Sequence, residues 1–478
     1  MPMNKRCQRT RATHRILSGS LRFDLVLIAL TFCFPMTACM VAQDKEAASQ
    51  EGAGRPTVSL TLPRAIEMAM QQNRRLKLAS LSVAESETKR SIAQSNYYPH
   101  ISNQSTVLYL TELEGVVVPA GAFGNSGVTG PIPGESLRLG QGAQAAYTSG
   151  TGLIQPFTQM FKIHAGDRAA AADVQIARIN ETDAQNSISL IVHQLYFDIL
   201  TTQAHLDAAR RSASAASINE SENTRAVAEG KSLDVAALQA HAAYLDRQQT
   251  VLTQQLAIDD SMLQFDDVLG LPLGTRLMLD GESLGLPPML PSRSEAIAAF
   301  KASNTKVLSA RQTVEKAKAA VSAARDAYIP DISGMARYSY QSGVPFLVHN
   351  FGTFGGLVSY DLFDGGAREA KLKQAKIELQ MAETQLQQTE SDVAIQISAA
   401  YDKTEQLQQL VSVVDEALTA RVEASRISAQ RVAQDAELAS SAAKDDAAVY
   451  DTKASLLEAR LGLFFAQDNI LQMLGHRP

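Results

Sequence analysis

The strongest constraint on the fold of this 478-residue chain is a change of hydrophobic period at Gly365-Gly366. Before the two glycines, "VSYDLF" alternates apolar and polar residues, as a strand with one apolar face does. After them, apolar and small residues recur every three or four positions, as in a helix that packs against another helix. A strand is therefore predicted to run almost directly into a long helix, with Gly365 and Gly366 as the strand-to-helix pivot.

The predicted helices are too long for an ordinary globule. A helix of ~65 residues reaches nearly 100 Å at 1.5 Å per residue. The chain has no Trp and only 6% aromatic residues, a composition typical of long helices rather than of a thick aromatic core. Coiled-coil-like hairpins are expected from the residue ranges 164–228 with 232–268, and 367–433 with 437–473.

The sequence contains an internal duplication. Asn73 and Asn304, in "MQQNRRL" and "KASNTKV", are 231 residues apart, whereas Gly270 and Gly475, near the ends of the two copies, are 205 residues apart. The first copy therefore carries 26 extra residues, which fall within 99–156 in a segment rich in Gly and Pro. Such a segment is predicted to be a surface loop.

Each copy is predicted to hold a helix, two strands and a long helix hairpin. The first helices are expected at 63–97 and 293–328, and the first copy's strands near 100–112 and 141–155. In the second copy, "ISGMARYSYQ" and "FGGLVSYDLF" alternate apolar and polar residues over about ten positions, the length and pattern of outer-membrane barrel strands. The predicted fold class is mainly α with membrane β-barrel strands. Four strands cannot close a barrel, because small barrels need about eight, so several copies must share one.

The N-terminus resembles a bacterial export signal. Basic residues precede the apolar run "LVLIALTFCF", and "PMTAC" then ends at Cys39, which is predicted to be lipidated; ordinary signal cleavage nearby is the alternative. Cys7, Cys33 and Cys39 are the only cysteines, so no disulfide framework is expected. The predicted segments are a signal peptide (1–38), a flexible linker (40–56), the first repeat (57–280, with a long loop at 112–142), a linker (281–292) and the second repeat (293–478).

Over nearly all of the predicted mature sequence, the chain resembles the TolC-like outer-membrane efflux family. The matching stretches are "LTLPRAIEMAMQQN", the paired "YYP" and "YIP", "SYDLFDGG" and "LQFDDVLGLP". This resemblance implies a homotrimer whose protomers each give four strands to one β-barrel in outer-membrane lipid and two helix hairpins to an α-barrel in the periplasm. It also implies two partners, a periplasmic adaptor protein and an inner-membrane transporter.

The resemblance further implies a periplasmic tip at the hairpin turns, where the adaptor docks and the tube narrows. The expected tip residues are Val227, Ala228, Glu229, Gly230, Val432, Ala433, Gln434 and Asp435. Family members often carry acidic residues just past the second tip, but this chain has Ser441 and Lys444 there, which puts a carboxylate ring in doubt. The candidates for lining the aperture are Asp234, Ser441, Lys444 and Asp445, and the alternative is a solvated helix face near a turn.

Other functional classes find little support. The net charge of −6 gives no footprint for nucleic acid. The His residues lack metal-ligand spacing, and neither a phosphate-binding loop nor a nucleophile elbow is present. No enzyme activity, cofactor or metal is expected. Four tyrosines form either an aromatic girdle or ordinary strand packing: Tyr147, Tyr338, Tyr340 and Tyr360.

The predicted function is therefore an outer-membrane exit duct of a tripartite efflux pump, passively exporting small toxic compounds. An exit duct for type I protein secretion is the alternative within the same class. A lipid-anchored coiled-coil envelope scaffold without a pore is the alternative of another class.

Overall fold

The computed structural model describes residues 58–109, 111, 115–140, 145–275, 277–281, 289–343 and 348–476. These residues belong to a single compact unit. The predicted signal peptide, the linker 40–56, Cys39 and the other two cysteines lie outside the described residues, as do parts of the 112–142 loop and of the 281–292 linker.

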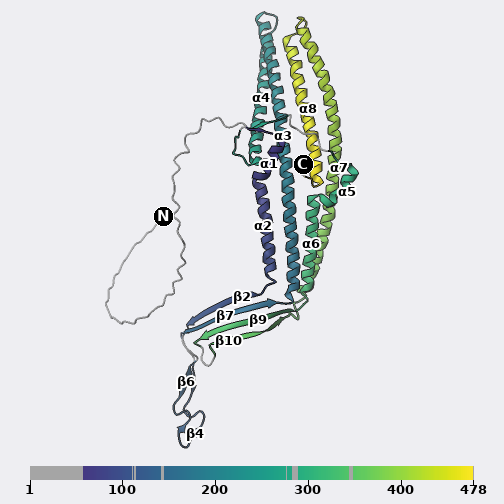
Figure 1. Ribbon diagram of the computed structural model, residues 1–478. Coiled ribbons are helices and arrows are strands. Elements are labelled where there is room, and N and C mark those ends of the chain that lie inside the picture. Colours follow the sequence, from purple (N-terminus) through teal and green to yellow (C-terminus); the bar gives the residue numbers. More distant parts are fainter. Residues whose placement is uncertain are drawn as a thin grey trace, which may run out of the picture. The chain divides into compact units, whose positions relative to one another are not determined.

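Eight helices are present in the described chain (Figure 1): α1 (Leu62–Gln72), α2 (Arg74–Ser95), α3 (Gln159–Ala228), α4 (Asp234–Leu269), α5 (Arg293–Ser303), α6 (Thr305–Asp326), α7 (Ala367–Val432) and α8 (Ala439–Met473). Its strands are β1 (Val58–Leu60), β2 (His100–Tyr109), β3 (Gly115–Val118), β4 (Asn125–Ser126), β5 (Gly130–Pro131), β6 (Leu137–Gly140), β7 (Ala145–Pro156), β8 (Leu277–Leu279), β9 (Asp331–Ser342) and β10 (Asn350–Ser359). The predicted fold class, mainly α with long helices and a few strands, is confirmed.

The two longest helices are uninterrupted. α3 has 70 residues and α7 has 66, so α3 extends about 105 Å at about 1.5 Å per residue. α3 begins at Gln159, before the predicted residue 164, while the other three long helices begin and end within two residues of the prediction. Their small and apolar stripe continues over the whole length, which is why neither helix breaks.

The predicted single helices at 63–97 and 293–328 are wrong in one respect, because each is two helices. The break falls at Asn73 and at Asn304, both of which have extended backbone dihedrals. The Asn73 side-chain oxygen accepts hydrogen bonds from the backbone N–H groups of Arg75 and Leu76, and Asn304 does the same for the residues at matching positions. A side chain that caps a new helix competes with continuation of the old one.

The same two asparagines join helices that are distant in sequence. The Asn73 amide donates to the backbone carbonyl of Val268 at 2.8 Å, and the Asn304 amide donates to that of Met473 at 2.8 Å. α4 therefore ends where α2 begins, and α8 ends where α6 begins. α3 packs along both members of each stacked pair, and α7 packs on α6 and α8.

The four long strands form an antiparallel sheet in the order β10-β9-β7-β2 (Figure 1). Register places Tyr338 opposite Thr151 and Gly352, so these residues share one face of the sheet. Arg337 lies on the other face, opposite Gly152 and Thr353. The two faces of β9 therefore separate as the sequence predicted. The strand expected in "FGGLVSYDLF" ends earlier, at Ser359, so Tyr360 follows it rather than lying inside it.

The buried core lies where the stacked helices meet. Tyr196 on α3 is fully buried, and its hydroxyl lies 3.0 Å from the Leu60 carbonyl and 2.8 Å from the Asp280 carbonyl. Its duplicate, Tyr401 on α7, donates to the Pro291 carbonyl at 2.8 Å. Both tyrosines therefore tie an extended segment to a long helix.

The described residues of the insert include two small antiparallel strand pairs. β3 pairs with β6, and β4 pairs with β5, all antiparallel. The insert was predicted only as a loop, because four-residue strands within a Gly/Pro-rich stretch leave almost no periodic signal.

Candidate functional site

The edge strands of the sheet and the outermost helices of the helical layer lie on the same two sides of the protomer. β2 and β10 are the two edge strands of the sheet. β2 follows α2, whose stacked partner is α4, and β10 precedes α7. Because α3 and the pair α6/α8 lie between them, the helical layer runs α2/α4, α3, α6/α8, α7 in the same order as the strands. Each free edge is thus continuous from strand to helix tip.

The predicted tip residues lie at the two hairpin turns, at the end of the helical layer remote from the sheet (Figure 1). Gly230 adopts a φ of 72° and Asp435 a φ of 57°. Such left-handed residues let a helix end and the chain reverse. Asp435 is the only residue other than glycine with a positive φ in the described part of the chain.

A contact between the two hairpins was missed by sequence reasoning. Glu222 of α3 accepts a hydrogen bond at 3.1 Å from the backbone N–H of Ser440, at the start of α8. A carboxylate at a helix N-terminus is favoured both by the unpaired N–H groups and by the helix dipole. Glu222 of the first hairpin thereby caps α8 of the second hairpin. No local sequence pattern predicts such a contact between distant segments.

The four aperture candidates differ in their surroundings. Ser441 donates to Glu437 at 2.6 Å, and Asp445 accepts a hydrogen bond from Ser428 of α7. Asp234 is the first residue of α4. Lys444 is exposed and forms no ion pair with a described carboxylate. Their place at the aperture remains a prediction.

The strand-to-helix pivot of the second copy is organised by Asp364. Gly365 and Gly366 have φ values of 65° and 85°, with open space around both. The Asp364 carboxylate accepts from the N–H of Gly366 at 3.1 Å and from the backbone and guanidinium of Arg368 at 3.0 and 2.8 Å. Hydrogen bonding from the Arg368 side chain, only partly opposed by burial, holds the pKa of Asp364 below its ordinary value.

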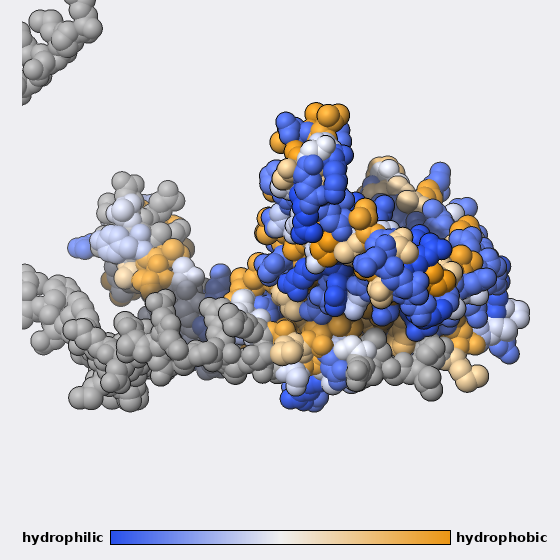
Figure 2. Space-filling view, turned by 90° about the horizontal axis from the view of Figure 1, so that it is seen from above, coloured by the Kyte–Doolittle hydropathy of each residue, from blue (hydrophilic) through white to orange (hydrophobic). Residues whose placement is uncertain are grey.

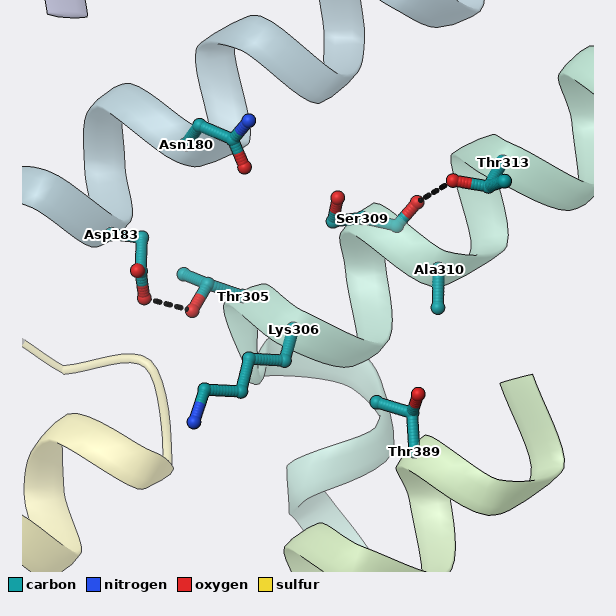
Figure 3. A pocket seen from close by; sticks show the side chains of 8 residues that line it. All are labelled: Asn180, Asp183, Thr305, Lys306, Ser309, Ala310, Thr313 and Thr389. Carbon is teal, nitrogen blue, oxygen red and sulfur yellow. Dashed lines mark hydrogen bonds between the residues drawn. The ribbon is translucent and has the colours of Figure 1, made fainter. Parts of the chain in front are cut away.

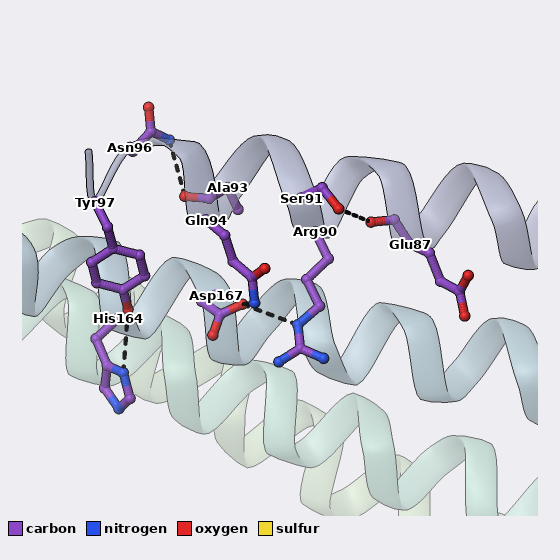
Figure 4. A network of polar contacts seen from close by, with 9 residues as sticks. All are labelled: Glu87, Arg90, Ser91, Ala93, Gln94, Asn96, Tyr97, His164 and Asp167. Atoms are coloured by element: carbon purple, nitrogen blue, oxygen red, sulfur yellow. Dashed lines mark hydrogen bonds and ion pairs between the residues drawn. The ribbon is translucent and has the colours of Figure 1, made fainter. Parts of the chain in front are cut away.

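The matching junction of the first copy uses different residues (Figure 4). Asp167 of α3 accepts from Arg90 and from Gln94 of α2, each at 3.0 Å. Burial disfavours the charge of Asp167, yet these two hydrogen bonds prevail and lower its pKa. Tyr97 lies 3.4 Å from His164 beside them. The network fixes the start of α3 against the end of α2, just before the sheet.

An open polar groove of about 390 Å³ lies between α3, α6 and α7 (Figure 3). Thr305 donates to Asp183 across it at 2.5 Å, and Lys306 lines it without an ion pair to a described carboxylate. Asn180, Ser309, Ala310, Thr313 and Thr389 complete the lining.

The remaining features are structural. His193 Nδ1 and a carboxylate oxygen of Asp468 lie 2.5 Å apart between α3 and α8, and both side chains are buried. The rings of Tyr147 and Tyr340 lie 5.9 Å apart, and their place in an aromatic girdle remains a prediction. Viewed from above, the surface of the helices is largely hydrophilic, with hydrophobic residues scattered among the polar ones (Figure 2).

Two kinds of feature are absent from the described residues. No three His, Cys, Asp or Glu side chains there converge in a way that could hold a metal ion. None of the described helices combines the length and the apolar character needed to cross a membrane.

Comparison with known proteins shows which family and which solved structures the chain is similar to. Residues 296–476 match the family of outer membrane efflux proteins. No curated protein matches the chain at a significant level. Among solved structures, the outer membrane channel CmeC of Campylobacter jejuni has a TM-score of 0.70 at 14% identity, over 87% of this chain and 85% of that one.

Two further structures agree. VceC of Vibrio cholerae, an outer membrane protein, has a TM-score of 0.67 at 16% identity, over 87% of this chain and 96% of that one. The MtrE outer membrane channel of Neisseria gonorrhoeae, in its open state, has a TM-score of 0.68 at 16% identity, over 87% and 89%. The predicted resemblance is confirmed: residues 296–476 form an outer membrane efflux protein domain, and the chain has the fold of the TolC-like outer-membrane efflux channels.

Proposed function

We propose that three copies of this chain form the outer-membrane exit duct of a tripartite pump, which passively carries small toxic compounds out of the cell. A periplasmic adaptor and an inner-membrane transporter supply the compounds and the energy. The hairpin tips, from Val227 to Gly230 and from Val432 to Asp435, are the surface that meets the adaptor and narrows the duct.

The observation that carries this proposal is that the unpaired edges of the sheet and the outer helices of the helical layer lie on the same two sides of the protomer. An open sheet edge is not tolerated in lipid, because its N–H and C=O groups have no partner there. β10 of one copy can pair with β2 of the next, and the same rotation brings α7 of the first copy to α2 and α4 of the second. Three copies with four strands each give a closed barrel within the size range of outer-membrane barrels.

The side chains on these edges support the pairing. Leu238, Leu245 and Leu252 on α4 are exposed and seven residues apart, which is the repeat of a coiled-coil seam. Ile377, Met381 and Ile395 are exposed apolar residues on α7. Rows of exposed apolar residues on a soluble helical surface indicate a partner.

The test is the efflux rate of a preloaded fluorescent dye in cells with and without the gene. Slower efflux without it, restored by the intact chain but not by a chain shortened at residues 432–437, supports a small-molecule duct with a functional tip. Unchanged efflux across several dyes contradicts that substrate class and directs the search to proteins missing from the culture medium. Absence of a heat-modifiable oligomer contradicts any pore and favours the scaffold.

A further inference from the structure

The connections between strands and long helices expose apolar side chains to an unusual degree. Between β10 and α7, Leu362 is 91% exposed and Phe363 is 89% exposed. In the first copy, Phe157 lies at the matching connection and Phe161 in the first turn of α3, and both are exposed. Large apolar side chains left this open in irregular segments indicate a surface that something else covers.

The position of Phe157 shows which face of the sheet these exposed apolar side chains adjoin. A Cβ added to Gly334 would lie 3.0 Å from the Phe157 ring, so the ring rests on Gly334. Gly334 shares a sheet face with Ala336 and Tyr338, the apolar face that a barrel turns toward lipid. The apolar face of the sheet therefore continues past the last strand residues to the helix starts.

Positively charged side chains lie next to these apolar residues, at the start of α7. Lys371, Lys373 and Lys376 are exposed in the first three turns of α7, and none forms an ion pair with a described carboxylate. They lie four, six and nine residues after Ala367, or about 6–14 Å along the helix at about 1.5 Å per residue. The headgroup layer of a bilayer is about 5–8 Å thick on each side, so these ammonium groups fall at its depth and just beyond.

We infer that this surface binds anionic phospholipid in the periplasmic leaflet of the outer membrane. Leu362 and Phe363, with Phe157 and Phe161 of the first copy, enter the acyl chains, and the three lysines hold the phosphate groups. Long aliphatic stems let lysines keep their charge in the headgroup layer while the apolar part lies deeper. The inference rests on the proposed placement of the sheet in the outer membrane.

The first copy provides an internal comparison. Over the corresponding first turns of α3, Lys162 pairs with Asp331 at 2.8 Å, and Arg168, which matches Lys373, is exposed and forms no ion pair with a described carboxylate. The apolar part of the surface is therefore duplicated, whereas the second copy has three exposed lysines without an ion pair to a described carboxylate and the first copy has one such cation, Arg168.

The absence of Trp from the chain makes a direct experiment possible. Leu362→Trp places a single fluorescent reporter at the proposed surface. Leu233→Trp is the matched control, because Leu233 is 79% exposed at the tip remote from the sheet. Both full-length proteins are reconstituted in vesicles of phosphatidylethanolamine with a quarter phosphatidylglycerol, in which either lipid can carry bromine on its acyl chains.

Brominated lipid is expected to quench the indole fluorescence of the Leu362→Trp protein strongly and that of the Leu233→Trp protein not at all. At equal mole fraction, brominated phosphatidylglycerol should quench the Leu362→Trp protein more than brominated phosphatidylethanolamine does. The reason is that each lysine near an anionic membrane surface contributes about 1 kcal/mol of attraction, or about fivefold in affinity for the anionic lipid. Adding Lys371→Gln, Lys373→Gln and Lys376→Gln together should remove the difference, and the three arginine substitutions should keep it.

The possible outcomes separate this inference from the proposed function. A channel that conducts ions while the reporter of Leu362→Trp remains unquenched overturns the lipid site and leaves the duct standing. Equal quenching by the two lipids overturns the role of the lysines. Strong, lysine-dependent quenching in a protein that forms no channel supports the lipid site and counts against the duct.

Discussion

Gly270 lies so close to Gln72 that a Cβ at its position would be 2.8 Å from the Gln72 carbonyl oxygen. Gly270 also has a φ of 74°, which only glycine adopts without strain. This contact packs the end of α4 against the end of α1, and the equivalent Gly475 packs against Ser303 in the second copy.

Gly270→Ala is therefore expected to destabilise the protein by more than the ~1–2 kcal/mol that a left-handed conformation costs, because the methyl group also meets backbone. Gly230→Ala is the control, since Gly230 has nearly the same φ but nothing within 4 Å. The measurement is the temperature at which the oligomer dissociates. Equal losses in the two variants would contradict the close packing.

Asn73→Ala removes both the cap of α2 and the bond to Val268. A lost N-cap costs about 1 kcal/mol, and the buried carbonyl left without its donor adds to this. Denaturant titration of the reconstituted protein should give a lower midpoint for this variant and a similar loss for Asn304→Ala. Asn96→Ala, whose side chain makes only contacts of 3.3 and 3.5 Å, should change little.

Acid stability should depend on Asp167. Its pKa is lowered in the folded protein from an ordinary value of 3.8, so the folded state binds its proton less readily than the unfolded state. The stabilisation is thus fully present above the ordinary pKa and is lost as pH falls through the folded value. Asp167→Asn should flatten the fall in dissociation temperature between pH 5 and pH 3. An unchanged slope would contradict the assignment, and Arg90→Gln should resemble Asp167→Asn.

Glu222→Ala removes the carboxylate that caps the start of α8. A hydrogen bond to a charged group contributes about 1.5–3 kcal/mol, or roughly tenfold or more in the equilibrium between joined and separated hairpins. Single-channel conductance without adaptor should then rise or fluctuate more. Glu229→Ala, which breaks only an exposed pair with Lys231, serves as the control. Identical traces from both variants would argue against a coupling between the hairpins.

The leucine row of α4 tests the oligomer. Leu245→Asp with Leu252→Asp places two charges on the proposed seam and should abolish the heat-modifiable oligomer while leaving the helix content intact. Leu233→Asp adds a charge at another exposed leucine near the tip and should not affect assembly. An oligomer that survives both seam substitutions would place the contact between copies elsewhere.

Much of this fold could be predicted because its signals are periodic. The long helices followed from their small and apolar stripe, and the offsets of 231 and 205 residues matched Asn73 with Asn304 and Gly270 with Gly475. The sequence analysis did not predict that each asparagine breaks a helix, because the helical pattern of apolar residues continues on both sides of it. Asn is a preferred N-cap residue, so a search for N-cap residues inside the predicted helices could have found both breaks.

The contacts that were missed join distant segments. The bond from Ser440 to Glu222 spans 218 residues, and that between His193 and Asp468 spans 275. Neither has a local pattern, because each depends on which faces of two helices meet. The role of the aperture residues likewise depends on contacts between distant segments, here those of neighbouring copies of the chain.

The asparagine breaks give the helical layer two kinds of rod. α3 and α7 are continuous, and bending one stretches hydrogen bonds along its outer side. The stacked pairs, α2 with α4 and α6 with α8, are instead jointed, and a joint can turn through a few backbone dihedrals while every helical hydrogen bond stays intact. Mechanical compliance of the stacked pairs is thereby concentrated at Asn73 and Asn304, while each tip stays tied to the sheet through the unbroken α3 or α7.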